Sequence, residues 1–176
     1  MAWSFGLAAE CGESEADAAR FCQYFQGSVL NLNDGSSFEC RGDIFQDLED
    51  NWWCRVCPQG VSLTGINTPE TAYVMTEIGI LLYRLLQSAP AFRFALVGVE
   101  VDEFRTYDEL IEDREILAML FPGLVLANPV WQSLGSPGSF RKFAGDYVWL
   151  SYAGEVYHPL RASSDLTERL DRLSVV

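Results

Sequence analysis

Residues 68–102 constrain the fold of this chain most, because they combine a very apolar helix with the most apolar strand of the sequence. Thr68 can cap a helix, Pro69 suits the first helical position, and Glu70 favours the positive end of the helix dipole. Apolar residues then recur at helical spacing, at Met75, Ile78, Leu82 and Leu85. The pattern predicts a helix that is buried in the core.

The polar residues of this helix form one narrow face. Glu70, Glu77 and Arg84 fall one heptad apart, and we expect them to face solvent. After a break at residues 88–90, the segment 92–101 has few polar positions, which predicts a central strand. The stretch therefore indicates how the domain is built, and it says little about what the protein does.

The elements predicted before this stretch give the order strand, helix, strands, helix, strand. A Ser14 cap opens the first helix, and Asp34-Gly35 suits a tight hairpin turn. Residues 3–9, 29–33, 36–40 and 52–56 are the predicted strands. This order predicts an α+β fold with a ferredoxin-like β-α-β-β-(β)-α-β core, in which two helices cover one face of a mainly antiparallel sheet. An open α/β sheet is the alternative.

The remaining residues predict an extension made of a helix, a hairpin and a second helix. A capping box at Thr106 and Glu109 opens a helix that runs to Phe121, residues 128–139 are expected to be irregular, and Ser164 caps the last helix. Strands at 147–152 and 156–158 are the predicted hairpin. We expect residues 1–103 to form the core and residues 104–176 to pack on it, as one domain rather than two.

The charge balance restricts the partners. The chain has 12 Lys and Arg against 25 Asp and Glu, for a net charge of -13. Such a field repels phosphate backbones and anionic headgroups, so we expect no binding to nucleic acid or membrane surfaces. It favours a basic protein partner or a cation, or it serves solubility alone. No segment approaches the roughly 20 apolar residues of a membrane span.

The five cysteines predict reduced thiols in the cytoplasm, because an odd, scattered set does not form a disulfide framework. The amino terminus also lacks the basic residues of a secretory signal. Cys54 and Cys57 have the spacing of a redox or zinc pair, yet in a strand they would point to opposite faces. We therefore predict free thiols, no metal and no cofactor, and the role of this pair stays open.

Acidic residues crowd the exit of the predicted central strand and the start of the next helix. A solvated helix face and carboxylate metal binding by Glu100 and Asp102 are two interpretations. A third is an acidic docking surface, because concentrated charge speeds association with a partner of opposite sign. The candidate binding residues are Glu100, Asp102, Glu103, Asp108, Glu109, Glu112 and Asp113.

A second candidate site is a pocket between the sheet and the extension. Its predicted lining residues are Trp131, Trp149, Tyr157 and His158, the only histidine of the chain. Core packing of these aromatic residues is the alternative interpretation.

No complete catalytic constellation is present, and this leads to the functional prediction. We expect a non-enzymatic, acidic, cytosolic interaction protein, acting as an inhibitor or neutralising partner of a basic protein. The alternative is a small-molecule-binding enzyme that uses a pocket between sheet and extension. The sequence leaves homo-oligomer formation open.

Overall fold

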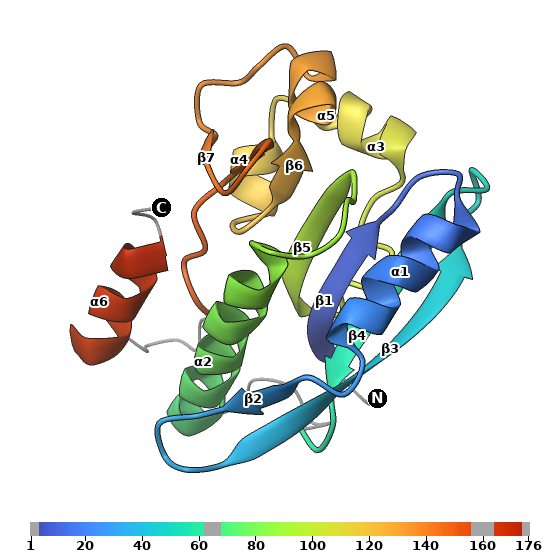
Figure 1. The fold of residues 1–176 in the computed structure, drawn as a ribbon. Coiled ribbons are helices and arrows are strands. Elements are labelled where there is room, and N and C mark those ends of the chain that lie inside the picture. Colours follow the sequence, from blue (N-terminus) through green and yellow to red (C-terminus); the bar gives the residue numbers. More distant parts are fainter. Residues whose placement is uncertain (1–3, 62–67, 156–163, 174–176) are drawn as a thin grey trace.

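The computed structural model describes residues 4–61, 68–155 and 164–173 and contains one eight-stranded sheet (Figure 1). Its strand order is β2-β3-β4-β1-β5-β6-β8-β7, and every described ladder is antiparallel. The strands are β1 (Phe5–Glu10), β2 (Val29–Asn31), β3 (Ser37–Gln46), β4 (Trp52–Pro58), β5 (Phe94–Val99), β6 (Val125–Ala127), β7 (Arg141–Lys142) and β8 (Tyr147–Trp149). The helices are α1 (Glu15–Phe25), α2 (Pro69–Leu86), α3 (Tyr107–Glu112), α4 (Leu117–Leu120), α5 (Asn128–Ser133) and α6 (Ser164–Leu173).

Local signals in the first hundred residues produce the elements that they predict. The Ser14 side chain accepts a hydrogen bond from the Asp17 amide at the start of α1, and Thr68 does the same for Thr71 at the start of α2. The β2–β3 hairpin turns at Gly35, whose φ of 88° lies in the region that glycine tolerates. These caps and turns are short-range features and can be recognised from the sequence.

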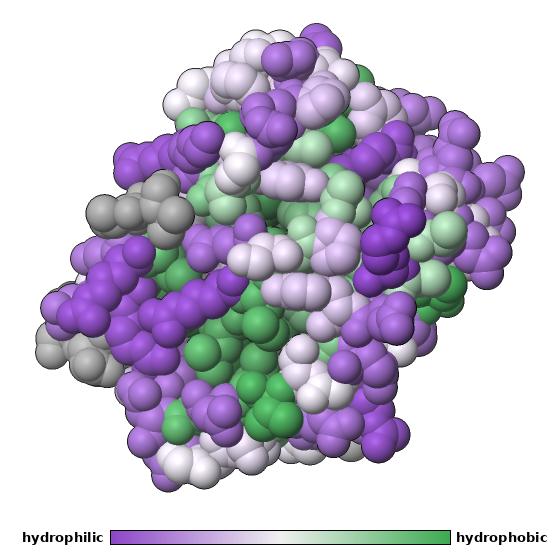
Figure 2. Space-filling model, in the orientation of Figure 1, coloured by the Kyte–Doolittle hydropathy of each residue, from purple (hydrophilic) through white to green (hydrophobic). Residues whose placement is uncertain are grey.

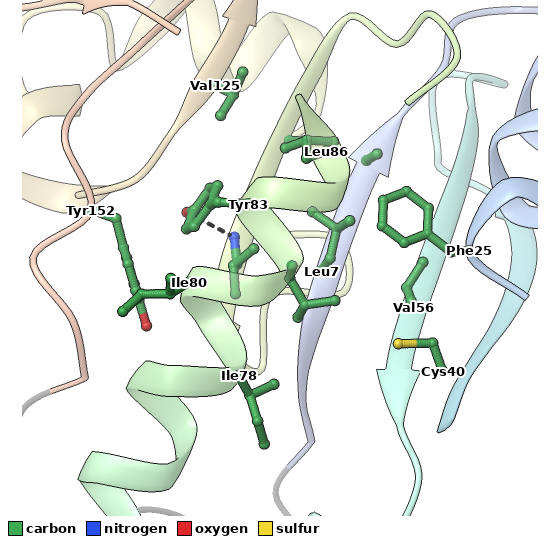
Figure 3. Packing of buried hydrophobic residues seen from close by; sticks show 14 of the residues in the cluster. Leu7, Phe25, Cys40, Val56, Ile78, Ile80, Tyr83, Leu86, Val125 and Tyr152 are labelled. Carbon is green, nitrogen blue, oxygen red and sulfur yellow. Dashed lines mark hydrogen bonds between the residues drawn. The ribbon is translucent and has the colours of Figure 1, made fainter. Parts of the chain in front are cut away.

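Helices cover both faces of the sheet, and each face has its own apolar cluster. α1, α2 and α6 pack on the first face, over a cluster that includes Leu7, Phe25, Ile78 and Tyr83 (Figures 1 and 3). α3, α4 and α5 contribute to a second cluster on the opposite face, with Trp53, Phe94, Leu96, Leu117 and Val130. We call these the first core and the second core. None of the described helices is long and apolar enough to cross a bilayer.

The fold class is confirmed as α+β with a mainly antiparallel open sheet and six described helices. The ferredoxin-like topology is not established, because the sheet has eight strands. Three of them, β6, β8 and β7, come from the extension and continue the sheet beyond β5. The ladder that joins β5 to β6 pairs Phe94 with Leu126 and Ala95 with Val125.

The extension differs from its prediction in three places. The single helix expected from Thr106 to Phe121 is divided into α3 and α4. The segment 128–139, expected to be irregular, begins with α5. Pro129 lies in the first turn of this helix, where a backbone N–H has no partner within the helix, so the missing N–H of proline costs nothing. The predicted hairpin would pair the strand at 147–152 with residues 156–158. Instead, β8 pairs with β6 on one side and with β7 on the other. Residues 156–158 lie outside the described residues.

The predicted exposed line on α2 is wrong at Glu77. This side chain is only 2% exposed, because α6 packs beside α2. Its carboxylate accepts a hydrogen bond from Arg169 of α6 at 2.8 Å and one from the Asn33 amide at 2.9 Å. A residue 92 positions away in the chain therefore supplies the charge partner, which local spacing cannot reveal.

Candidate functional site

The predicted acidic residues follow β5 and continue along α3, but several carboxylates are already engaged. Asp102 pairs with Arg55 at 2.9 Å, and Asp113 pairs with Arg105 at 2.7 Å. Glu109 closes the capping box by accepting a hydrogen bond from the Thr106 amide. The other four residues, Glu100, Glu103, Asp108 and Glu112, are exposed, and no ion pair within the described part of the chain involves them.

Exposed apolar side chains gather next to these carboxylates. The described chain has five exposed large hydrophobic residues. Three of them are Ile116, Met119 and Leu120, whose exposed fractions are 42%, 74% and 39%. Glu115 directly precedes Ile116, Glu112 lies in the turn before it, and both are exposed. We call the set Glu100, Glu112, Glu115, Ile116, Met119 and Leu120 the α4 face.

A cavity of about 290 Å³ adjoins the α4 face and lies between β5 and the extension. Leu120 and Glu100 belong both to the α4 face and to the cavity wall. The rest of the wall comes from β5, from the loops around Phe104 and Phe121, and from Tyr152, Gly154 and Glu155. We call this space the β5–β6 cavity.

The cavity exists because β5 and β6 separate after two residue pairs. Beyond Ala95 the strands no longer pair, and the hydroxyl of Tyr83 from α2 takes the place of a ladder bond (Figure 3). It accepts a hydrogen bond from the Val97 amide at 3.2 Å and donates one to the Gly123 carbonyl at 2.9 Å. The side chain thus bridges the two edges at the point where they diverge.

Tyr152 closes the helix side of this gap. It is 6% exposed and packs against Tyr83, with the two ring centroids 4.9 Å apart. Glycine at position 79 of α2 makes room for it, because a Cβ there would overlap the Tyr152 hydroxyl. The apolar helix α2 therefore supplies Tyr83, which bridges the strands, and makes room for Tyr152, which lines the cavity.

Glu155 supplies the partly buried carboxylate of the cavity, whereas Glu100 is exposed. It accepts a hydrogen bond from the Tyr152 hydroxyl at 3.1 Å, and its own amide donates to the Thr76 hydroxyl at 2.8 Å. Desolvation raises the pKa of Glu155 to about 7, and the hydrogen bond from Tyr152 opposes this shift only in part. At neutral pH the carboxyl is therefore divided between its neutral and charged forms.

The buried acid Glu10 has a cation beside it, whereas none of the described Lys, Arg or His residues pairs with Glu155. Its carboxylate accepts hydrogen bonds from Arg93 and from the Gly12 amide, both at 2.5 Å. Arg93 in turn lies over the ring of Tyr107, at 4.7 Å from its centroid. Glu10 is therefore satisfied within the fold.

Of the four predicted pocket residues, the structure describes Trp131 and Trp149, and these two pack against different cores. Trp149 is 1% exposed in the first core, where it packs on Tyr83 and Phe143. Trp131 packs against the second core, and its indole donates to the Pro137 carbonyl. Tyr157 and His158 lie outside the described residues.

Sequence reasoning did not single out Tyr83 and Glu155. The available signal was weak: one tyrosine within the apolar run of α2, and one glutamate in the short segment 151–156, which is otherwise without charge. Both act through partners far along the chain, so spacing alone could not identify them.

Cys54 and Cys57 point to opposite faces of β4. Cys54 is buried in the first core, whereas the Cys57 sulfur lies on the other face, beside Gly6. All five cysteines are free, and burial raises the pKa of Cys54 well above that of an ordinary thiol. Among the described residues, no group of three or more His, Cys, Asp or Glu side chains could hold a metal ion.

Figure 2 shows a second apolar area, over α2 between α1 and α6. The apolar α2 residues that are only partly buried are Tyr73, Val74, Leu81 and Leu85, and all four pack against the first core. This area is therefore the rim of a core, whereas Met119 of the α4 face is mostly in solvent.

Comparison of the chain with protein-family models, with curated proteins and with solved structures found no match. The functional inference therefore depends on the residues themselves.

Proposed function

We propose that this chain is a non-enzymatic, acidic interaction protein that binds a basic protein through the α4 face and acts as its inhibitor or neutralising partner. The observation that carries the proposal is the position of three exposed apolar residues beside exposed carboxylates. Protein interfaces commonly combine an apolar centre with a polar rim, and the centre provides most of the affinity.

The charge of the chain supports the same partner. A net charge of -13 raises the rate of encounter with a basic protein and repels acidic ones. Glu100, Glu112 and Glu115 can add specificity because no ion pair within the described residues involves them. Binding should therefore weaken at high salt, as expected for exposed charges.

Affinity capture from the parent cells tests this proposal when wild type and variants are compared in parallel. We expect wild type to retain a protein of net positive charge at low salt and to release it at high salt. The double variant Glu112→Lys/Glu115→Lys and the single variant Met119→Asp should both lose that protein. The matched control Glu13→Lys/Glu39→Lys changes charge equally, at exposed positions outside the α4 face, and should retain it.

Binding of the captured protein to purified wild type must then reproduce these differences. Loss of binding in the control, or binding that does not change with salt, would contradict the electrostatic role of the α4 face. Capture of acidic proteins only would contradict the proposal itself.

The second candidate function is a small-molecule-binding enzyme, and the β5–β6 cavity is the observation that favours it. The cavity lies between the sheet and the extension and contains a carboxyl with a pKa of about 7, which suits a general acid or base. A small molecule that raises the melting temperature of wild type but not of Glu155→Gln would support this function.

We propose a ferredoxin-like core, which the order β3-β4-β1-β5 and the location of α1 and α2 on one face both support. We also propose one domain and a cytoplasmic location; five free cysteines support the latter.

A further inference from the structure

Glu10 and Glu77 are buried and Glu155 is partly buried, and a desolvated carboxylate requires a charge partner or hydrogen bonds. Glu10 has Arg93, and Glu77 has Arg169. Within the described residues, the Glu155 carboxylate has only the Tyr152 hydroxyl, and no Lys, Arg or His among them pairs with it. Of these three glutamates, Glu155 lines the β5–β6 cavity.

The cavity walls suit a side chain with an apolar stem. Leu96, Phe104, Leu120 and Phe121 supply apolar surface, and Glu155 lines the same cavity with its carboxylate beside β5. One Glu155 oxygen is 4.0 Å from the position that a Cβ on Gly98 would occupy. A volume of about 290 Å³ is just below the range for small-molecule pockets, which runs from about 300 to 1,000 Å³.

We propose that the β5–β6 cavity receives a lysine or arginine side chain of the basic partner, with the Glu155 carboxylate as its counter-ion. The proposal rests on the proposed function and identifies its central contact. Lys and Arg both place a charged group at the end of an apolar stem, which matches a cavity that has apolar walls and a carboxylate in its lining. Side chains that fill such pockets are typical interface anchors.

A protein side chain fits the position of the cavity better than a free amine does. Leu120 and Glu100 are shared between the α4 face and the cavity wall, so a partner that covers this face reaches the cavity opening. Glu100 is exposed and adopts a φ of 52°, in the left-handed region, where the chain turns away from β5. Its charge adds to the attraction for a cation at the opening.

Short peptides test the contact without the partner. The probe is acetyl-Gly-Lys-Gly-amide, with its Arg equivalent, and acetyl-Gly-norleucine-Gly-amide is the uncharged control. The titration is followed by NMR at about pH 8, where most of Glu155 is ionised. We expect saturable shifts of the Val97, Gly98 and Val99 amides with Lys or Arg and none with norleucine.

Two variants separate charge from shape. Glu155→Gln keeps an acceptor for Tyr152 but removes the charge, and should weaken peptide binding about tenfold. Gly98→Ala places a methyl group near Glu155 and should also weaken binding. Glu112→Gln removes a charge outside the cavity and should leave peptide affinity within about twofold of wild type. Amide spectra of each variant establish that it is folded.

The proposal is wrong if neither basic peptide gives a saturable shift, if the norleucine peptide binds equally well, or if the affinity is unchanged in Glu155→Gln. A fourth arm uses n-butylamine. If it binds more tightly than both basic peptides, the cavity belongs to a small amine and the assignment to a protein side chain is wrong. None of these results depends on Glu112, Glu115 or Met119, which do not line the cavity; the capture experiment with Glu112→Lys/Glu115→Lys and Met119→Asp tests that part of the α4 face separately.

Discussion

At the residue scale, Glu155 couples the cavity to the stability of the fold. Its pKa rises from 4.5 to about 7 on folding, because burial penalises the charged form. Below about pH 4.5 both states hold the proton and no penalty applies. As the pH rises, Glu155 ionises first in the unfolded state, so the free energy of unfolding decreases until the pH passes the pKa of Glu155 in the folded state. The loss is at most about 3 kcal/mol.

The variant Glu155→Gln isolates this loss. We expect wild type to lose stability relative to the variant between about pH 5 and about pH 8, since the amide cannot ionise. Denaturant midpoints at both pH values, with unchanged slopes, measure the difference. Glu112→Gln, at an exposed position, should follow wild type at both pH values. If the free energy of unfolding changes with pH in the same way in wild type and in Glu155→Gln, burial does not raise the pKa of Glu155.

At the element scale, Tyr83 of α2 holds β5 and β6 together where their ladder ends. Replacing it by Phe removes the hydroxyl and leaves the Val97 amide and the Gly123 carbonyl without this partner. We expect Tyr83→Phe to destabilise the fold by about 1–3 kcal/mol. Hydrogen exchange of the Val97 amide should also accelerate, because the cavity edge opens more readily.

Tyr73→Phe is the matched control on the same helix. Tyr73 is only partly buried and lies away from the β5–β6 junction, so its replacement should change the unfolding free energy by less than about 0.5 kcal/mol. If Tyr83→Phe has the same stability and the same Val97 exchange rate as wild type, the hydroxyl does not bridge these strands.

The contrast between predicted and observed elements follows from the range of the interactions. Ser14, Thr68 and Gly35 act on residues a few positions away, so α1, α2 and the β2–β3 hairpin could be predicted. Leu110 and Leu117 are seven residues apart and both are buried, so their periodicity continues across the break between α3 and α4. That break could not be predicted from the pattern.

The candidate site depends on long-range contacts, and less of it could be predicted. The acidic run was visible because its residues are adjacent in sequence. The Arg55–Asp102 pair, which removes one carboxylate from it, joins positions 47 residues apart. The cavity requires Tyr83 to reach Gly123, 40 residues away, and no local pattern encodes that contact.

At the scale of the whole molecule, the sheet connects the proposed core to the extension. β5 belongs to residues 1–103 and β6 to residues 104–176, yet the two strands pair directly. Both cores contain residues from both parts: the first includes Leu7 and Trp149, and the second includes Trp53 and Leu117. Disrupting either part therefore exposes apolar surface of the other, which favours cooperative unfolding.

We therefore expect a single unfolding transition, and two tryptophans can report it separately. Trp53 of β4 lies in the second core, and Trp149 of β8 lies in the first. With fluorine-labelled tryptophan, their two NMR resonances should lose native intensity at the same denaturant concentration, together with the far-UV circular dichroism signal. Trp53→Phe and Trp149→Phe assign the resonances. If Trp149 loses its native signal while Trp53 keeps it, the extension unfolds independently, and the chain contains two domains rather than one.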